Sequence, residues 1–386
     1  MNRACPICLS NNKKQLYKQN FGNQTIAPMI GYNIVICQEC GFAYADNIPS
    51  QEKFDDYYTE MSKYEFSHSD GIVAEKYVNH FQNIVDFLIP YLANKKSKII
   101  DIGCSTGCLL SLLKSEGYCD LTGLDPSQAC VKTAKELYNI DIINGSISDL
   151  NDSKKYDLVI LSAVLEHLVD FEGSLNKICS SLNHNGLIFI EVPDALRFSS
   201  YITAPFQQFS IEHINYFSKY SIANLLSKYS FELLNVLENV NLTNELSDPD
   251  IFVMAKKVDN SSFKIERDNV SEINLKEYIK ASTEIDLKIK KIIKEKLIDK
   301  EKIIIWGVGT HTQRLIGSGL DLKQVAYFVD SNERYCGKEM NGVKIKSPND
   351  INEDVPILIS SYSYQDEISK QIRDDLKLDN EILKLY

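Results

Sequence analysis

The sequence predicts an α/β protein built on a Rossmann-like sheet, with a small cysteine-rich module before this sheet and a half-Rossmann unit after it. Two C-x-x-C pairs lie near the N-terminus, and a strand, glycine turn, helix and acid-terminated strand follow from Lys98 to Ser127. The same opening returns between Lys302 and Asn332. We therefore expect three parts: a cysteine-rich module at 1–66, the sheet domain at 67–258, and a linking helix with the half-Rossmann unit at 259–386.

Length and charge limit the classes of partner. A chain of 386 residues is long enough for two or three domains, and 44% hydrophobic with 25% charged residues is typical of a globular protein. The net charge of -11 argues against a nucleic-acid polymer or an anionic membrane as the main partner, since both favour a basic surface. The N-terminal stretch "MNRACPICLS" has no apolar core of a signal peptide, which predicts a cytoplasmic protein.

The first part of the chain holds four of the ten cysteines in two knuckles. "CPIC" supplies Cys5 and Cys8, and "CQECGF" supplies Cys37 and Cys40. Four thiolates in this pattern predict a tetrahedral, structural Zn²⁺ site whose binding energy stabilises a short segment. The alternative is a pair of redox dithiols, which a thioredoxin-like strand before either knuckle would favour. The other six cysteines are expected to be reduced and to pack in the core.

The second part begins with a buried strand at 99–102, a turn, an amphipathic helix and a second strand that ends at Asp125. Gly103 and Gly107 allow the backbone of the turn to approach a ligand closely, and the following helix offers unpaired N–H groups. Asp125 lies where the acid that closes the second strand accepts hydrogen bonds from ribose hydroxyls.

The turn has the pattern D-x-G-x-x-x-G, with Asp101 at its start and Ser105 where many relatives carry glycine. This resembles motif I of the class I S-adenosylmethionine (SAM)-dependent methyltransferases. The resemblance runs from about residue 70 to 257 and includes "NGSISDL", "YDLVILSAVLEHLVD", "LNHNGLIFIEVP" and "DIFVMAKK". It implies that Asp101 faces the amino group of SAM and that Ser146 and Ile147 lie beside the adenine.

The half-Rossmann unit repeats this opening as "KIIIWGVGTHTQRLI" and "VAYFVDSN". Gly307 and Gly309 form the turn and Asp330 ends the second strand, but Thr312 stands in place of a third glycine. Either this unit serves packing alone, or His311 and the N–H groups of the turn contact a nucleotide-linked substrate. Between the two folds, the lysine-rich stretch 274–302 predicts one long amphipathic helix that packs on the C-terminal unit.

A four-cysteine zinc module, a class I methyltransferase and a C-terminal half-Rossmann unit, in this order, resemble the sugar C-methyltransferases of bacterial deoxysugar pathways. The resemblance implies a nucleotide-linked 4-keto-6-deoxy sugar as the substrate, methylated at the carbon beside its ketone. Such a carbon becomes nucleophilic only as an enolate, so the site needs a base and a hydrogen-bond donor to the enolate oxygen.

Members of this family carry a histidine after the fourth strand and a Tyr-x-Glu-His stretch after the fifth. The first matches His167 of "VLEH", and the second matches Glu212 and His213 of "FSIEHINYFS". The resemblance implies that His213 is the base and that Glu212 orients it. This sequence departs from the pattern at Ser210, where the family has tyrosine.

Members of the family also carry a tyrosine upstream of motif I. The stretch "FDDYYTEMSKY" offers Tyr57, Tyr58 and Tyr64 in this region. We assign Tyr58, or His167, as the group nearest the enolate oxygen. Tyr64, Tyr216 and His311 are the expected substrate contacts.

Each of these assignments has a structural alternative. His167 could order its loop through a hydrogen bond, and His213 could be satisfied by Glu212 in the cover of the cofactor pocket. His68, His80 and His184 lack acidic company in the sequence and are assigned structural roles. An O- or N-methyltransferase of a related small acceptor is the alternative enzyme, and a SAM-binding adaptor without catalysis is the alternative from another class.

Overall fold

A computed structural model describes residues 2–22, 28–61, 68–69, 72–73, 75–151, 153–242, 247–259, 263–318 and 320–386. These residues form two compact units, and segments of the two units alternate along the chain. Unit 1 comprises residues 1–15, 35–201 and 212–275, and unit 2 comprises residues 16–34, 202–211 and 276–386. The division into three consecutive parts at residues 66 and 258 stays a prediction.

Unit 1 is built on a seven-stranded sheet in the order β12-β13-β10-β9-β6-β7-β8. Strand β13 runs antiparallel to both of its neighbours, whereas β10, β9, β6, β7 and β8 are parallel to one another. This confirms the predicted α/β, Rossmann-like class I methyltransferase fold. The strands are β6 (Lys98–Ile102), β7 (Asp120–Asp125), β8 (Ile142–Asn144), β9 (Tyr156–Ser162), β10 (Leu182–Pro193), β12 (Phe231–Leu242) and β13 (Ser247–Lys257).

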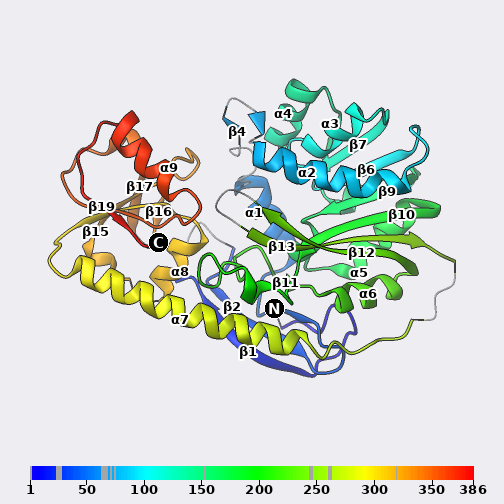
Figure 1. Cartoon of the computed structure of the whole chain (residues 1–386), viewed down its shortest axis with the longest axis horizontal. Coiled ribbons are helices and arrows are strands. Elements are labelled where there is room, and N and C mark those ends of the chain that lie inside the picture. Colours follow the sequence, from blue (N-terminus) through cyan, green and yellow to red (C-terminus); the bar gives the residue numbers. More distant parts are fainter. Residues whose placement is uncertain are drawn as a thin grey trace. The chain divides into compact units, whose positions relative to one another are not determined.

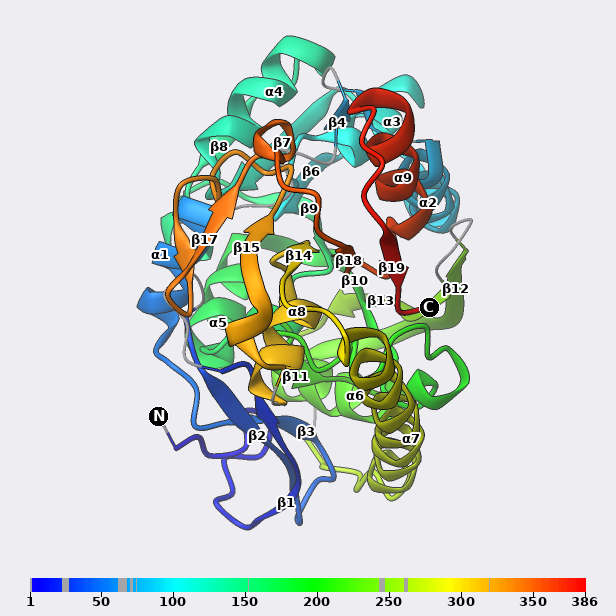
Figure 2. The same cartoon turned by 90° about the vertical axis from the view of Figure 1, so that its left-hand side faces the viewer.

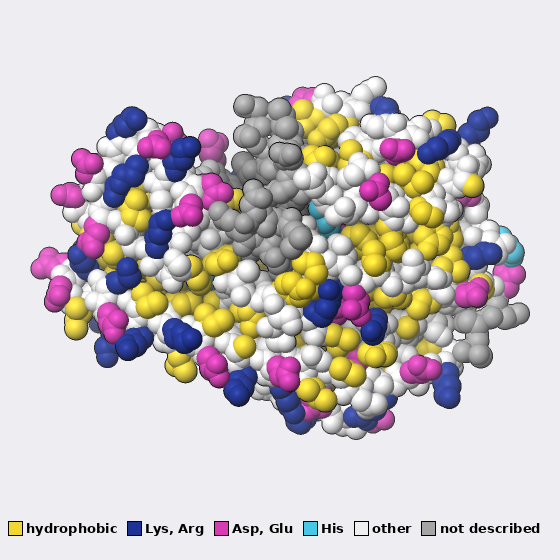
Figure 3. Space-filling view, in the orientation of Figure 1, with side chains coloured by type: hydrophobic (Ala, Val, Ile, Leu, Met, Phe, Trp, Pro, Cys, Tyr) yellow, Lys and Arg dark blue, Asp and Glu magenta, His cyan; other side chains and the backbone are white. Residues whose placement is uncertain are grey.

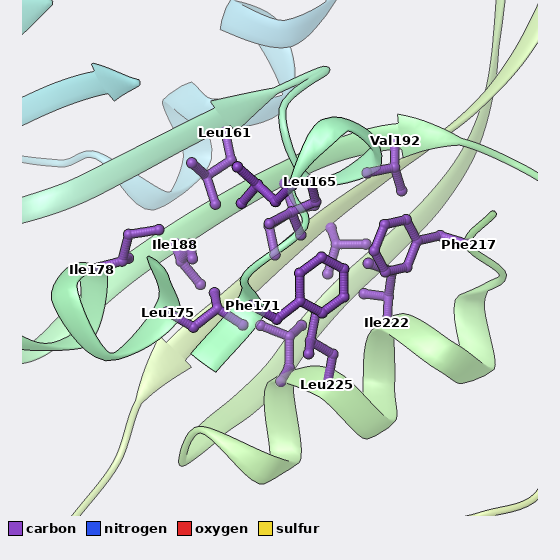
Figure 4. Packing of buried hydrophobic residues seen from close by; sticks show 14 of the residues in the cluster. Leu161, Leu165, Phe171, Leu175, Ile178, Ile188, Val192, Phe217, Ile222 and Leu225 are labelled. Atoms are coloured by element: carbon purple, nitrogen blue, oxygen red, sulfur yellow. The ribbon is translucent and has the colours of Figure 1, made fainter. Parts of the chain in front are cut away.

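Helices cover both faces of this sheet because its buried strands alternate between two cores. In β9, Leu158 and Ile160 pack with helices α2 and α3, while Val159 and Leu161 pack with α5 and α6. Figure 1 shows α2, α3 and α4 together on one side of the sheet, and Figure 4 shows the packing of α5 and α6 on the other. The helices of unit 1 are α1 (Gln51–Met61), α2 (Glu75–Leu88), α3 (Cys108–Ser115), α4 (Gln128–Tyr138), α5 (Phe171–Ser181) and α6 (Lys219–Lys228), with the 3-10 turns η2 (Ile89–Tyr91), η3 (Ile147–Asp149), η4 (Leu165–His167) and η5 (Phe198–Ser200).

The N-terminal segment does not form a core of its own. Its four-stranded sheet has the order β1-β2-β3-β11, with β1 (Lys13–Asn20), β2 (Gly31–Cys37) and β3 (Ala43–Asp46) from the N-terminal segment and β11 (Asn215–Tyr216) from the segment after β10. Phe42 and Tyr44 belong to the same hydrophobic cluster as Phe171 and Phe217. The parts of the cysteine-rich segment that belong to unit 1, residues 1–15 and 35–46, therefore share one core with the seven-stranded sheet. A separate short hairpin joins β4 (His68–Ser69) and β5 (Ile72–Val73).

The surface of unit 1 has an apolar strip along its edge strand. Strand β12 ends the seven-stranded sheet, and Leu233, Leu234 and Leu237 on it are each more than 40% exposed. Hydrophobic side chains gather on the surface over β12 and β13 (Figure 3). No helix within the described residues is long and apolar enough to cross a membrane.

Unit 2 contains the predicted half-Rossmann sheet, in the order β16-β17-β15-β14-β18-β19 (Figure 2). All neighbouring strands are parallel except the β16–β17 pair. Strand β14 alternates between two cores, with Ile303 and Ile305 on one face and Ile304 and Trp306 on the other. Its elements are α7 (Ser271–Leu297), β14 (Ile303–Trp306), α8 (Thr310–Gly317), η6 (Leu322–Gln324), β15 (Val325–Val329), β16 (Glu339–Met340), β17 (Val343–Lys346), η7 (Pro348–Asp350), β18 (Ile357–Ile359), α9 (Gln365–Lys370), the π-helical turn η8 (Gln371–Asp375) and β19 (Ile382–Lys384).

The predicted long helix is α7, whose first five residues belong to unit 1 and whose remainder belongs to unit 2. Ile289 and Leu297 of α7 are buried in the core of unit 2, which confirms that this helix packs on the C-terminal unit.

Candidate active site

The motif I turn connects β6 to α3 and is closed by Asp125. The backbone N–H groups of Ser105 and Ser127 donate to the two carboxylate oxygens of Asp125, at 2.8 and 2.9 Å. Gly103 and Ser105 both adopt positive φ angles, of 73° and 49°. A side chain at Gly103 would place its Cβ 2.8 Å from Val164, so only glycine fits there. The turn and the end of β7 thus form one rigid edge.

Asp101 lies at the end of β6 as a buried carboxylate without a cation. It is 3% exposed, and no described residue donates a hydrogen bond or forms an ion pair with its side chain. Burial, reinforced by the negative charges of Asp125 and Glu191, raises the pKa of Asp101 well above its usual range. A cationic ligand would remove this cost, so the site suits an ammonium group or a sulfonium.

The other expected cofactor residues lie on the neighbouring strand ends. Gly107 caps α3 with a φ of 80°. Ser146 and Ile147 follow β8 at the start of η3, where Ser146 and Asp149 form a reciprocal capping box. Asn144 donates from its side chain to the carbonyls of Asp125 and Pro126, at 3.2 and 3.0 Å, and so ties the end of β8 to the end of β7. The carboxyl ends of β6, β7 and β8 therefore form a common edge.

A second cluster gathers the expected acid–base residues. The rings of His167 and His213 pack edge to face with centroids 5.1 Å apart. Two tyrosines of α1 reach this pair: the Tyr57 hydroxyl donates to Glu212 Oε1 at 3.2 Å, and the Tyr58 hydroxyl lies 3.1 Å from His167 Nδ1. The structure thus brings together four residues that were assigned roles from the sequence, and with them Tyr57, which the sequence offered without a role of its own.

One hydrogen bond sets the tautomer of His167. Its Nδ1 atom lies 3.0 Å from the backbone carbonyl oxygen of Glu212. A carbonyl oxygen only accepts, so the proton of this bond belongs to Nδ1. Any second proton on the ring must therefore sit on Nε2, which lies 3.8 Å from Glu166 Oε1.

Glu166 is the most buried acid of this cluster. It is 1% exposed, and its Oε2 atom has no hydrogen-bond partner among the described residues. Burial, with a smaller contribution from the charge of Glu191, raises the pKa of Glu166 to about 8. The carboxylate of Glu166 and the imidazoles of His167 and His213 lie within 4.8 Å of one another.

Asn215 joins the two segments that carry His167 and His213. Its side-chain amide donates to the carbonyls of Leu165 and Leu168, at 3.0 and 2.7 Å, and the N–H of Ile214 donates to the carbonyl of Glu166 at 2.9 Å. Asn215 itself lies in β11, which pairs with β3 at Asn215 and Tyr44. The two histidines are therefore held by a shared backbone network.

Arg3 closes this network from the N-terminal segment. Its guanidinium is buried and donates to the carbonyls of Ala45 and Val169, at 3.1 and 3.2 Å, and to Asn215 Oδ1 at 3.2 Å. Burial outweighs the neighbouring negative groups and lowers the pKa of Arg3 to about 10. The sequence analysis missed Arg3, because one arginine before a cysteine knuckle gives no sign of its distant partners.

Three more buried groups surround the strand ends. His80 of α2 pairs with Glu191 of β10 at 2.8 Å, and Ser162 donates to the other oxygen of the same carboxylate. Asp250 lies close to this pair, where burial and the charge of Glu191 raise its pKa well above its usual range. Acids at the ends of hydrophobic strands are the sequence signal that could have identified Glu191 and Asp250.

The four N-terminal cysteines converge as expected for a metal site. The sulfurs of Cys5 and Cys40 are 3.5 Å apart, and those of Cys8 and Cys37 are 3.4 Å apart. Four thiolates around Zn²⁺ at about 2.3 Å have sulfur separations of about 3.8 Å. All four thiols are free of disulfides and three of them are buried, so the cluster fits a tetrahedral ion.

The remaining expected site residues lie elsewhere. Tyr64 falls outside the described residues. Tyr216 is 2% exposed within β11, and His311 of unit 2 accepts or donates a 2.7 Å hydrogen bond with the Tyr386 hydroxyl. Burial lowers the pKa of His311 to about 3, so this imidazole is neutral. All three stay predictions as substrate contacts.

Ser210 belongs to unit 2, where its carbonyl accepts a hydrogen bond from the Tyr32 hydroxyl at 2.5 Å. A tyrosine nonetheless contacts the Glu-His segment, because Tyr57 donates to Glu212.

Residues 73–236 match the family model described as "Methyltransferase domain". The chain contains a methyltransferase domain. Asp101, His167, Glu191 and Glu212 all lie within this match. Residues 299–383 match a second model, described as "C2185-like, N-terminal".

Several curated relatives match about a third of this chain. The chain is 24% identical over 130 residues to the ubiquinone biosynthesis O-methyltransferase of Rickettsia canadensis, which covers 32% of this chain and 50% of that protein. It is 28% identical over 142 residues to the malonyl-[acyl-carrier protein] O-methyltransferase of Acetivibrio thermocellus, which covers 34% and 48%. The chain thus spans about half the length of these curated relatives.

Solved structures resemble slightly more than half of the chain. The magnesium protoporphyrin IX methyltransferase of Synechocystis with bound SAM covers 55% of this chain and 98% of its own, with 16% identity and a TM-score of 0.41. The 1,6-didemethyltoxoflavin-N1-methyltransferase of Burkholderia thailandensis covers 57% and 98%, with 15% identity and a TM-score of 0.44.

Proposed function

We propose that the protein is a SAM-dependent methyltransferase that acts on a nucleotide-linked 4-keto-6-deoxy sugar, at the carbon beside the ketone. The observation that carries the proposal is the cluster of His167, Glu212 and His213 with two tyrosines of α1, which gathers a base, its partner and hydroxyl donors. Enolisation needs these group types together, whereas transfer to an already nucleophilic atom does not.

The motif I edge would hold the cofactor. Asp101 offers an unneutralised carboxylate to the ammonium group, Asp125 offers its carboxylate to the ribose, and Ser146 and Ile147 flank the adenine. SAM supplies an electrophilic methyl group on a sulfonium. The residues of the turn only bind and orient it, because their backbone geometry is fixed by the Asp125 hydrogen bonds.

At the acceptor, His213 removes the proton from the carbon beside the ketone, and Glu212 stabilises the resulting imidazolium. The electrons of the broken C–H bond form the enolate, whose oxygen accepts a hydrogen bond from Tyr58, supported by His167. The enolate carbon would then accept the methyl group that SAM supplies when bound, and His213 releases its proton to water.

The four cysteines are proposed to bind a structural Zn²⁺. Four thiolates fill a tetrahedral coordination sphere and leave no position for a substrate, so this ion would stabilise the N-terminal sheet and take no part in transfer.

Methyl transfer to oxygen or nitrogen of a related acceptor is the second candidate. Ser210 in place of the family tyrosine favours it, and the curated relatives named above are O-methyltransferases. In that case His213 would deprotonate a hydroxyl or ammonium group instead of a carbon.

Hydrogen exchange separates these two functions. Incubation with a 4-keto-6-deoxy sugar nucleotide in heavy water, without cofactor, should introduce deuterium beside the ketone. We expect His213→Ala to abolish this exchange and His184→Ala, which removes an exposed histidine, to leave it intact. Absence of both exchange and a methylated product on every keto sugar tested would rule out C-methylation in favour of the second candidate.

A further inference from the structure

Glu166 has no role in the function proposed above, yet its side chain is one of the most buried charged groups of the methyltransferase domain. It immediately precedes His167 in the turn η4, and the backbone of this turn is fixed by Asn215. The carboxylate therefore has a defined position relative to the imidazole.

The hydrogen bonds of His167 leave one ring proton, the one on Nε2, that Glu166 can stabilise. The Glu212 carbonyl keeps a proton on Nδ1, so the charge of the ring depends on whether Nε2 carries a second one. Glu166 Oε1 lies 3.8 Å from Nε2, and the other oxygen of Glu166 has no partner among the described residues.

We propose that Glu166 is a positioning residue for His167: the two groups together hold one proton, which sits on Nε2, 3.8 Å from the carboxylate, and makes the imidazole a cation beside Tyr58. A cation next to the phenol strengthens Tyr58 as a hydrogen-bond donor, because it stabilises negative charge on the phenol oxygen. The role in catalysis rests on the proposed function, whereas proton sharing itself does not.

The surrounding charges favour retention of this proton. Glu191 of β10 and Asp250 of β13 face Glu166 as acids, and His213 is the other imidazole of the cluster. The structure describes no lysine or arginine that pairs with Glu166, so losing the proton would leave a buried, uncompensated negative charge. Burial raises the pKa of Glu166 to about 8, so an isolated carboxylate is disfavoured here, and a proton on His167 Nε2 supplies the compensating positive charge.

Proton sharing can be measured without any substrate. Long-range ¹H–¹⁵N NMR spectra of the zinc-loaded full chain, labelled in histidine, report the protonation of each ring nitrogen. At pH 7 we expect a protonated or exchanging Nε2 for His167 in the wild type, and an unprotonated Nε2 in Glu166→Gln. Asp286→Asn is the matched control, because it removes a buried carboxylate of unit 2 that pairs with Arg314 instead.

The pH profile of turnover tests the catalytic consequence. With a turned-over keto sugar, Glu166→Gln should lower kcat roughly tenfold or more while KM changes little. The wild-type rate should fall above about pH 8 as the shared proton is lost, and the variant should lack this limb. Glu166→Asp, which keeps the charge, should restore part of the rate.

Two results would overturn the proposal. One is an Nε2 of His167 with the same protonation state in wild type and Glu166→Gln across the whole pH range. The other is one more equivalent of divalent metal per chain in the wild type than in Glu166→Gln, since an ion would then take the place of the proton. An unchanged NMR signature with normal turnover contradicts only this proposal, whereas intact proton sharing without turnover contradicts only the proposed function.

Discussion

At the scale of single residues, the ion pair of His80 and Glu191 links helix α2 to the end of β10. The imidazole is buried, and burial by itself disfavours its charged form. The charge of Glu191 and the 2.8 Å hydrogen bond outweigh burial and raise the pKa of His80. A histidine assigned a structural role from the sequence thus proves to have an acidic partner.

This pair predicts a pH-dependent contribution to stability. A histidine whose pKa rises on folding contributes fully below its unfolded pKa of about 6.5, and the contribution is lost as pH rises through the folded pKa. His80→Ala should therefore lower the free energy of unfolding by about 3 kcal/mol at pH 6 and by clearly less at pH 9. Urea unfolding at the two pH values measures the difference.

His184→Ala serves as the control for this prediction. His184 also contacts an acid, Asp259, at 2.8 Å, but both side chains are more than two-thirds exposed. Its removal should change stability little at either pH. An equal loss for His80→Ala at both pH values would contradict the assigned charge.

Residues also differ in how far the sequence could predict them. Asp101, Gly103 and Asp125 form a local pattern within one strand–turn–helix–strand unit, so their spacing alone placed them. Arg3 and Asn215 act through partners far away in the chain, and nothing in their own neighbourhoods marks these contacts. Glu166 was overlooked because the family pattern directed attention to the adjacent His167.

At the scale of elements, strand β11 links the cysteine-rich sheet to the candidate active site. It directly follows Glu212 and His213 and pairs antiparallel with β3, at Asn215 with Tyr44 and Tyr216 with Ala43. The cysteine-rich sheet thus supports the segment with the proposed base, which residues read in sequence order could not show. Phe217, just beyond β11, stacks on Phe171 with centroids 5.9 Å apart.

Metal removal should therefore loosen a segment far from the cysteines in the sequence. After zinc is removed with a chelator, we expect faster amide hydrogen exchange at 43–46 and 214–217, together with a fall in melting temperature of roughly 10 °C or more. Mass spectrometry after exchange measures the first, and strands β14 and β15 should be unchanged.

Cys8→Ser should reproduce this effect, and Cys119→Ser should not, because Cys119 is an exposed thiol outside the cluster. Unchanged exchange at 214–217 in metal-free protein would show that β11 does not depend on the ion.

Gly41 and Gly117 both have positive φ angles, but only Gly41 lies close to other atoms. Substitutions at the two positions therefore distinguish the cost of backbone strain from the cost of a steric clash. Gly41, after the second knuckle, has a φ of 79°, and an added Cβ would lie 2.0 Å from the carbonyl oxygen of Asp268. Gly117 has a φ of 91° but has open space around it. Gly117→Ala should cost about 1 kcal/mol of stability, from strain alone.

Gly41→Ala should cost about 3 kcal/mol or more and reduce the zinc content of the purified protein, because the knuckle must move away from Asp268. Chemical unfolding and metal analysis of the two variants make the comparison. Equal costs would mean that the contact with Asp268 relaxes freely.

In both glycine turns, the aspartate that ends the second strand accepts two backbone hydrogen bonds. In unit 1, Asp125 accepts from the N–H groups of Ser105 and Ser127. In unit 2, Asp330 accepts from those of Val308 and Asn332, at 3.0 and 2.9 Å. The repeat seen in the sequence thus extends to individual hydrogen bonds. The two turns differ at Thr312, which stands in place of the third glycine and whose hydroxyl donates a hydrogen bond to the carbonyl of Gly307.

At the scale of the whole molecule, the chain passes between its two units more than once. Residues 16–34 and 202–211 belong to unit 2, although segments of unit 1 lie on both sides of each. A sequence read from end to end favours consecutive domains, because local patterns do not show which distant segments share a core. The parts were predicted correctly as folds, but their interleaving comes from tertiary contacts.

This interleaving predicts that the methyltransferase domain is not separable at its sequence boundaries. A fragment of residues 67–258 lacks β3 and the N-terminal side chains of the shared core, so β11 would lose its partner and Phe217 would become exposed. We expect this fragment to aggregate or to unfold without cooperativity, whereas the full chain should unfold cooperatively. Circular dichroism during heating distinguishes the two, and a cooperative transition of the shorter fragment would contradict the prediction.

The long sequence separation between Arg3 and its partners also affects how the protein folds during its synthesis. The residue lies 211 positions before Ile214, whose carbonyl it approaches, so Ile214 and Asn215 emerge from the ribosome long after Ala45, its partner in β3. At about 5–20 residues per second, the N-terminal strands wait roughly ten to forty seconds for β11. During that interval Arg3 lacks these later partners and the edge of β3 is unpaired. Early metal binding or a chaperone would have to protect both until the segment that completes the sheet has been synthesised.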